Sequence, residues 1–75
     1  MKLSINRRRV FLAVAQQPGI SSHILAERLK LSKYSVRNAL TWLANAGAVF
    51  YKAAWYLTTY GQELFTTGLY LRKEF

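Results

Sequence analysis

The sequence has 75 residues, of which 52% are hydrophobic and 19% are charged, and it contains no cysteine. A chain of this length fills one core, is too apolar to be intrinsically disordered, and without thiols can hold neither a disulfide framework nor a thiolate zinc site. Eleven lysines and arginines against three acidic residues give a net charge of +8. This charge favours a polyanionic partner, although it could also simply keep an aromatic-rich chain soluble.

A first helix is predicted over about residues 4–17 of a single domain that spans residues 1–75. Its apolar side chains recur at helical spacing, at Val10, Phe11, Ala13 and Val14. Pro18-Gly19 then ends the helix. The longest apolar run, residues 10–15, is far shorter than the ~18 residues of a membrane span, and no secretory signal is recognisable. We therefore expect a soluble cytoplasmic protein, associated with the nucleoid and without a membrane partner.

Two further helices are predicted, each preceded by a serine. The hydroxyls of Ser21 and Ser32 can accept hydrogen bonds from unpaired amides, which favours helices over about residues 22–29 and 33–46. The second of these helices carries a single apolar stripe, formed by Val36, Ala39, Leu40 and Leu43. Gly47 then ends that helix, because glycine readily adopts the left-handed conformation of a helix C-terminus.

A two-stranded hairpin is predicted over about residues 48–58, where two short runs are rich in β-branched and aromatic residues. Its turn, at residues 52–54, contains neither glycine nor asparagine. Phe50 and Trp55 have two interpretations. They either pack across the two strands or contact a sugar-phosphate edge or another subunit.

A last helix is predicted over about residues 59–72, capped by Thr58 or Thr59 and weakened by Gly61 and Gly68. Its apolar residues cover more than one side of the helix. This favours a homodimer, with packing against the first helix of the same chain as the alternative. The candidate dimer contacts are Leu64, Phe65, Leu69, Leu71 and Phe75.

The order of these elements predicts a mainly α-helical fold with a small β-hairpin. The fragments that carry a family resemblance are residues 18–21, 25–29, 31–36, 39–49, and 56–58 with Gly61. Together they resemble the winged helix-turn-helix regulators of the MarR and ArsR kind and small fimbrial-operon regulators. The resemblance implies a three-helix core, a two-stranded wing and a C-terminal helix. It also implies a small prokaryotic, phage or plasmid transcriptional regulator that binds double-stranded DNA sequence-specifically.

Side chains suited to reading bases occupy the third helix, opposite its apolar stripe or in its first turn. They are Lys33, Tyr34, Ser35, Arg37, Asn38 and Thr41. Arg37 and Asn38 are the main candidates, because arginine can bond guanine and asparagine can bond adenine through two hydrogen bonds. An ordinary solvated surface would also be polar. However, no acidic residue occurs between Lys30 and Ala54, as expected where a surface faces phosphates.

Contacts with the DNA backbone are expected from hydroxyl and basic side chains around this helix. The candidates are Ser21, Ser22, Lys30, Ser32, Lys52, Arg7, Arg8 and Arg9. The three arginines have an equally good alternative interpretation as a solvated charge patch. If about five phosphates are neutralised, affinity should fall with salt at a log–log slope of roughly −0.9 per contact.

An enzyme is not expected, because the sequence has one histidine and only Glu27, Glu63 and Glu74 as scattered carboxylates. His23 is interpreted as a surface residue, and neither a metal, a cofactor nor a small-molecule effector is predicted. Two other functions remain open from the sequence, both without sequence-specific DNA readout: a winged-helix module for protein interaction or an architectural role, and RNA binding.

Overall fold

The structure is a computed structural model that describes residues 4–68. The elements in chain order are α1 (Ile5–Gln16), α2 (Ser22–Leu29), α3 (Lys33–Asn45), β1 (Val49–Tyr51), β2 (Trp55–Leu57) and α4 (Thr59–Thr67). This confirms the predicted fold class, a mainly α-helical winged helix with a two-stranded wing. None of the described helices is long and apolar enough to cross a membrane.

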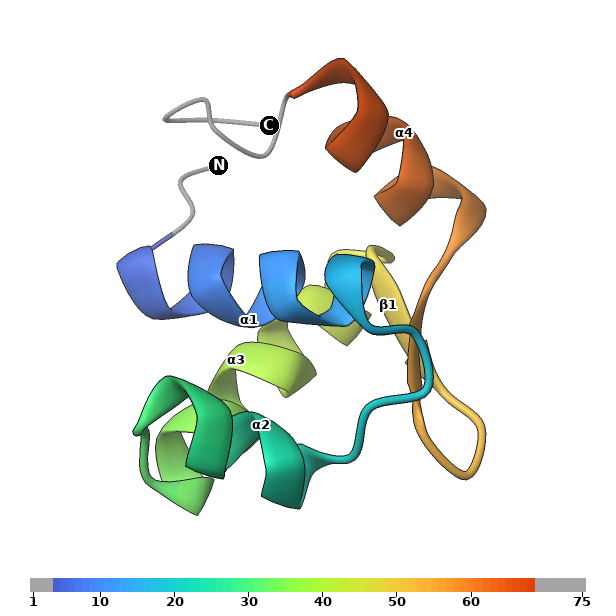
Figure 1. Cartoon of the computed structure of the whole chain (residues 1–75). Helices are drawn as coiled ribbons and strands as arrows, with labels where there is room; N and C mark the ends of the chain where they lie inside the picture. Colours follow the sequence, from blue (N-terminus) through green and yellow to red (C-terminus); the bar gives the residue numbers. More distant parts are fainter. Residues whose placement is uncertain (1–3, 69–75) are drawn as a thin grey trace.

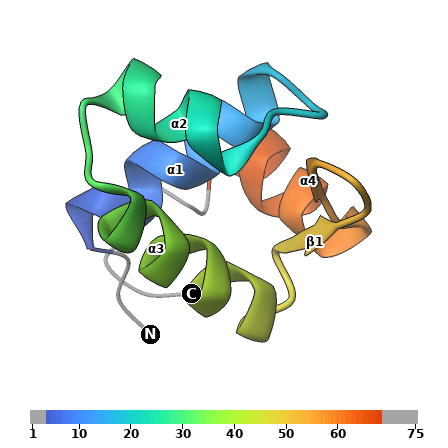
Figure 2. The same cartoon turned by 90° about the horizontal axis from the view of Figure 1, so that it is seen from below.

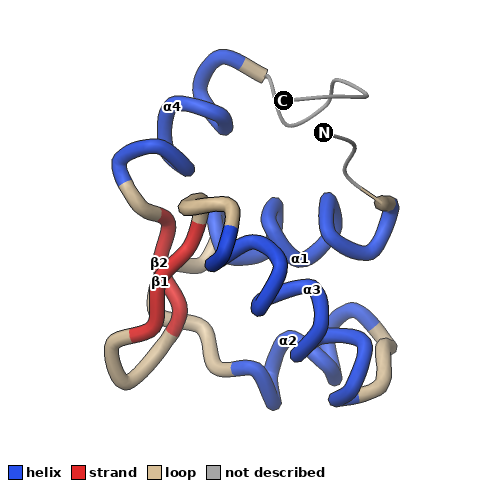
Figure 3. The backbone as a smooth tube through the Cα atoms, turned by 180° about the vertical axis from the view of Figure 1, so that it is seen from behind, coloured by secondary structure: helices blue, strands red, loops and turns tan. Residues whose placement is uncertain are grey.

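Helices α1, α2 and α3 form the centre of the fold (Figures 1 and 2). The predicted apolar stripes of α1 and α3 all face inward. Side chains from the wing and from α4 complete the core, with Ile20 closing it between α1 and α2. Helix α4 lies on the opposite side of α1 from α2 (Figures 1 and 3). The α2–α3 pair is therefore exposed on the side away from α4.

A hydroxyl caps the N-terminus of every described helix. The caps are Ser4, Ser21, Ser32 and Thr58, each accepting a hydrogen bond from the amide three residues later. The predicted caps of α2 and α3 are confirmed, and of the two threonines proposed for α4, Thr58 is the cap. Helix α2 ends at Leu29 and is capped by Lys30, a non-glycine residue with a φ of 55°. Helix α3 ends just before Gly47, which has a φ of 80° as predicted.

The wing is an antiparallel pair in which Val49 lies opposite Leu57 and Tyr51 lies opposite Trp55 (Figure 3). The segment between α1 and α2 forms an isolated antiparallel bridge with β2, between Ile20 and Trp55. The Gly19 amide donates to the Trp55 carbonyl at 2.9 Å, and the Trp55 amide donates to the Ile20 carbonyl at 3.0 Å. No sequence signal indicated this bridge, which holds the wing against the segment that leads into α2.

Helix α4 departs from the sequence prediction in length. It ends at Thr67 because Gly68 adopts the left-handed conformation, with a φ of 75°, and caps it. The predicted end near residue 72 lies outside the described residues. Gly61 also has a role that the prediction missed. A Cβ on this residue would lie 2.1 Å from the Ala48 carbonyl oxygen, so glycine lets α4 approach the backbone that precedes β1.

The predicted dimer contact at Leu64 is wrong in the described structure. Its side chain is only 2% exposed and packs in the core of its own chain. The reason is that α4 folds back over α1 and β2, which bury the apolar face that the sequence left without a partner. Phe65 is half-buried and packs against the same core. Leu69, Leu71 and Phe75 lie outside the described residues, so the homodimer stays a prediction.

Candidate nucleic-acid interface

The exposed face of α3 carries most of the side chains predicted to read bases. Because the apolar stripe turns inward, the opposite side of the helix points into solvent. Lys33, Arg37, Asn38 and Thr41 are all exposed, and Tyr34 is 72% exposed. Ser35 is half-buried. Five of the six predicted side chains are therefore accessible to a ligand that lies along this helix.

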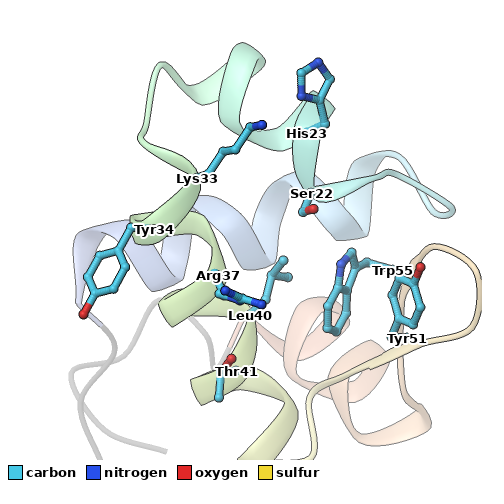
Figure 4. A pocket seen from close by; sticks show the side chains of 9 residues that line it. All are labelled: Ser22, His23, Lys33, Tyr34, Arg37, Leu40, Thr41, Tyr51 and Trp55. Carbon is cyan, nitrogen blue, oxygen red and sulfur yellow. The ribbon is translucent and has the colours of Figure 1, made fainter.

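A groove of about 730 Å³ runs between this face of α3, the start of α2 and the wing (Figure 4). Its lining residues are Ser22, His23, Lys33, Tyr34, Arg37, Leu40, Thr41, Tyr51 and Trp55. In Figure 4 the guanidinium of Arg37 lies between the α2 side and the wing side, and Tyr34 lies on the side of α3 away from the wing. The groove thus combines cationic, hydroxyl and aromatic groups.

The charge of the groove is positive. Lys33 and Arg37 line it and no carboxylate does. Within residues 4–68, neither of these two cations forms a hydrogen bond or an ion pair. The nearest acidic group in sequence, Glu27, forms an exposed contact of 3.3 Å with His23. Lys33 and Arg37 are therefore accessible to an external anion, which would gain charge-assisted hydrogen bonds from them.

The two main candidates for base readout lie on different sides of the exposed face. Arg37 lines the wing groove, whereas Asn38 lines a smaller hollow beside the N-terminal half of α1. Ser35 lies in the same hollow, and its hydroxyl accepts a hydrogen bond of 3.0 Å from the Ser32 hydroxyl. Ser32 also accepts from the Ser35 amide at 3.0 Å. Both hydroxyls thus contribute to the start of α3, and Ser32 has little remaining capacity for a ligand.

The three consecutive arginines of α1 have three different environments. The guanidinium carbon of Arg7 lies 4.3 Å from the centroid of the Trp42 ring. The Nε of Arg8 is buried without a hydrogen-bond partner among the described residues. The Nη2 of Arg9 donates to the Leu29 carbonyl at 2.7 Å, and so holds α1 against the end of α2. Both interpretations offered in the sequence analysis, a DNA-backbone contact and a solvated charge patch, treated the three arginines as one group. Consecutive residues of a helix point in different directions, so the three side chains lie apart.

The other backbone candidates lie around the α2–α3 pair. Ser21 caps α2 through its own side chain, and Ser22 lines the groove. Lys30 is exposed in the turn between the two helices, and Lys52 is exposed at the turn of the wing. Ser22 therefore borders the groove directly, whereas Lys52 does not line it and only follows Tyr51, which does.

The wing presents aromatic pairs rather than a row of cations. Phe50 stacks on Tyr56 with ring centroids 5.5 Å apart, and Tyr51 meets Trp55 edge-on at 5.1 Å. Cross-strand packing is therefore the observed arrangement for both Phe50 and Trp55, although Phe50 remains 42% exposed. Tyr51, 63% exposed, lines the groove and was not among the predicted site residues. Its position opposite Trp55 in the hairpin register is the sequence signal that could have identified it.

The described fold is similar to solved structures of MarR family regulators. A MarR family protein of Mycobacterium tuberculosis in complex with DNA has a TM-score of 0.82 at 27% identity, over 89% of this chain and 54% of that one. Another MarR family transcription regulator has a TM-score of 0.79 at 18% identity, over 85% and 48% of the two chains. The multiple antibiotic-resistance repressor MarR of Listeria monocytogenes has a TM-score of 0.76 at 22% identity, over 92% and 53%.

These likenesses confirm the resemblance to winged-helix regulators that the sequence indicated. The chain spans about half the length of each of these solved structures. The sequence matches no protein-family model and no curated protein.

Proposed function

We propose that this chain binds double-stranded DNA sequence-specifically through α3 and acts as a small transcriptional regulator of a prokaryote, phage or plasmid. The observation that carries the proposal is the exposed face of α3. It holds Lys33, Arg37 and Thr41 opposite the core stripe, beside a groove without a carboxylate. The proposal is also supported by the crystal structure of a similar MarR family protein in complex with DNA.

In the proposed complex, α3 lies in the major groove. That groove is about 12 Å wide and admits one α-helix with its side chains. Arg37 then reads guanine, Asn38 reads adenine, and the methyl group of Thr41 meets a thymine methyl. Lys33 and Tyr34 lie in the first turn of α3, the end that meets base edges when such a helix docks.

The backbone contacts in the proposed complex come from both sides of this helix. Ser22 lies at the N-terminus of α2, where unpaired amides favour an anion, and Lys52 lies at the turn of the wing. Such contacts set the position of the protein without selecting a sequence. Because the wing carries only one cation among its aromatic residues, we assign no minor-groove readout to it.

The test is selection of bound duplexes from a random pool, followed by binding titrations at several salt concentrations. The variants are Arg37→Ala and, as a matched control, Arg28→Ala, which removes the same charge from an exposed position of α2 outside the groove. We expect Arg37→Ala to lose preference at one base pair, corresponding to about 1–3 kcal/mol of discrimination. Arg28→Ala should keep the preference.

Two outcomes would contradict the proposal. If the wild-type chain shows no affinity for duplex DNA at low salt, the nucleic-acid function fails. If duplex binding occurs without any sequence preference, an architectural role replaces the regulatory one. A parallel titration with single-stranded RNA tests the remaining alternative, RNA binding. RNA readout relies on stacking of unpaired bases, so it would depend on Tyr34 rather than on Arg37.

A further inference from the structure

A small polar hollow lies on the flank of α3 that faces α1. Its volume is about 170 Å³, and it is lined by Ser4, Asn6, Arg7, Ser35, Asn38 and Ala39. All but one of these side chains can donate a hydrogen bond, and none is acidic. Asn38 and Arg37 belong to one exposed face of α3, so the hollow and the wing groove border the two sides of the same helix surface.

Arg7 is the cation of this hollow, and the ring of Trp42 fixes its position. The side chain is half-buried, and the guanidinium carbon lies 4.3 Å from the ring centroid. A cation–π contact uses the charge and the ring face but none of the N–H donors. In the described part of the chain, the guanidinium of Arg7 makes no hydrogen bond or ion pair. Its donors are therefore held in place and remain available to an anion.

The neighbouring Arg9 has a different role. Its Nη2 donates to the carbonyl of Leu29, the last residue of α2, at 2.7 Å. That bond connects two helices of the core and directs the guanidinium of Arg9 to the end of α2, away from the residues that line the hollow. Arg9 therefore serves as an internal comparison for Arg7, because the two residues have the same charge on the same helix.

The geometry of a duplex explains why this position matters. An α-helix with its side chains is about 10–12 Å across and nearly fills a major groove about 12 Å wide. Phosphates of one strand then border one flank of the helix, and phosphates of the other strand border the opposite flank. The wing-side flank of α3 has Lys33 and Arg37 in its groove. On the other flank, the hollow places Arg7 beside Ser35 and Asn38.

We propose that Arg7, together with the Ser35 hydroxyl, binds a phosphodiester of the DNA strand that borders α3 on the side away from the wing. The ligand is a single phosphate group, and its source is the duplex that α3 reads. This inference rests on the proposed function. It assigns to one residue outside the helix-turn-helix a contact that fixes the rotation of α3 in the groove.

The first test measures the salt dependence of binding to a selected duplex. We expect Arg7→Ala to reduce the log–log slope by about 0.9, the value for one lost phosphate contact. Arg7→Lys should keep the slope, because it keeps the charge. Arg9→Ala and Arg28→Ala should also keep it, each after circular dichroism has confirmed folding. An unchanged slope in Arg7→Ala, or an equal loss in all three alanine variants, would overturn the proposal.

The second test locates the phosphate. Neutral methylphosphonates replace the phosphates of the selected duplex one at a time. For the wild-type chain, we expect one substitution on the strand away from the wing to weaken binding several-fold. The same substitution should have no effect on Arg7→Ala but should keep its effect on Arg28→Ala. If every substitution acts equally on the wild-type chain and Arg7→Ala, no phosphate contacts Arg7 and the inference is wrong.

A third arm asks whether a free anion and the duplex use the same hollow. Inorganic phosphate and chloride are compared as competitors at equal ionic strength. A free anion can compete through the hollow only if the duplex also occupies it, so we expect phosphate to weaken duplex binding more than chloride does in the wild-type chain, and the two salts to act equally on Arg7→Ala. Stronger competition by phosphate against both proteins alike would place the anion site elsewhere and overturn the assignment of the contact to Arg7. If the wild-type chain binds no duplex at all, it is the proposed function that fails.

Discussion

Two regions of the molecule are held together by different kinds of interaction. One is the helix-turn-helix, formed by α2 and α3, and the other is the corner where residues 47–48 meet residues 58–61. In the helix-turn-helix, Ser21 and Ser32 cap their own helices through residues three positions away. In the corner, α4 meets the Ala48 carbonyl at Gly61, and Thr58 donates a hydrogen bond to the Gly47 carbonyl. The first region is therefore specified by local contacts, and the second by contacts between residues distant in sequence.

The difference shows where function and stability lie in this small chain. The helix-turn-helix presents its polar face to solvent, so most substitutions there should change ligand binding more than folding. The corner lines neither the wing groove nor the hollow beside α1, yet it closes the core over α1 and β2. Substitutions in the corner should therefore change the free energy of unfolding most.

The largest effect is expected for Gly61→Ala. Judged by helix propensity alone, alanine should stabilise α4 by about 1 kcal/mol. In the structure its Cβ would lie 2.1 Å from the Ala48 carbonyl oxygen, and this oxygen belongs to the backbone and cannot move aside easily. Overpacking costs about 1–3 kcal/mol, and a clash with backbone lies at the upper end of that range, so after the gain in helix propensity we expect a net loss of about 2 kcal/mol.

Urea denaturation shows directly whether Gly61→Ala lowers or raises the free energy of unfolding. Gln62→Ala, at an exposed position of the same helix, is the matched control and should change stability by less than about 0.5 kcal/mol. A gain in stability for Gly61→Ala would show that α4 does not pack closely against the backbone at Ala48, contrary to the structure.

A smaller effect is expected for Thr58→Ala. The Thr58 hydroxyl accepts from the Gly61 amide at 3.0 Å and donates to the Gly47 carbonyl, so it joins the start of α4 to the end of α3. Loss of an N-cap costs about 0.5–2 kcal/mol, and we expect a value near 1.5 kcal/mol here because a second bond is lost. Thr59→Ala is the natural control, because Thr59 is exposed and already inside the helix.

The thermal unfolding midpoints of the two variants test this assignment. Thr58→Ala should lower the midpoint by several degrees, since about 1 kcal/mol shifts a domain of this size by roughly 4–8 °C. Thr59→Ala should leave it nearly unchanged. If the two variants shift the midpoint equally, both threonines contribute to the cap, and the two hydrogen bonds of Thr58 do not by themselves stabilise the corner.

Most of the fold could be predicted from the sequence because its signals are local. The serines before α2 and α3, the apolar stripe of α3 and the glycine at residue 47 each act within one turn of helix. The same signals located the exposed face of α3, since the side opposite a buried stripe must face solvent. The resemblance to winged-helix regulators added the order in which these elements pack.

The features that were missed depend on tertiary contacts. The bridge between Ile20 and Trp55 joins residues that are far apart in the sequence, and neither residue type indicates it. The burial of Leu64 and the separate roles of Arg7 and Arg9 depend on which helix packs beside them. Helical spacing alone gave the apolar and basic positions of these segments but not their partners.

The smallest effect, and the only gain, is expected at the tip of the wing. Ala53 has a φ of 59°, a conformation that L-residues adopt at a cost and glycine adopts freely. Ala53→Gly removes this strain but adds backbone entropy to the unfolded chain, so we expect a net stabilisation of about 0.5 kcal/mol. Ala54→Gly should destabilise instead, because Ala54 is half-buried and has no positive φ to relieve. Chemical denaturation of both variants shows whether the turn is under local strain. Equal losses in the two variants would mean that the hairpin, like the corner beside it, is held by its cross-strand aromatic pairs rather than by its turn.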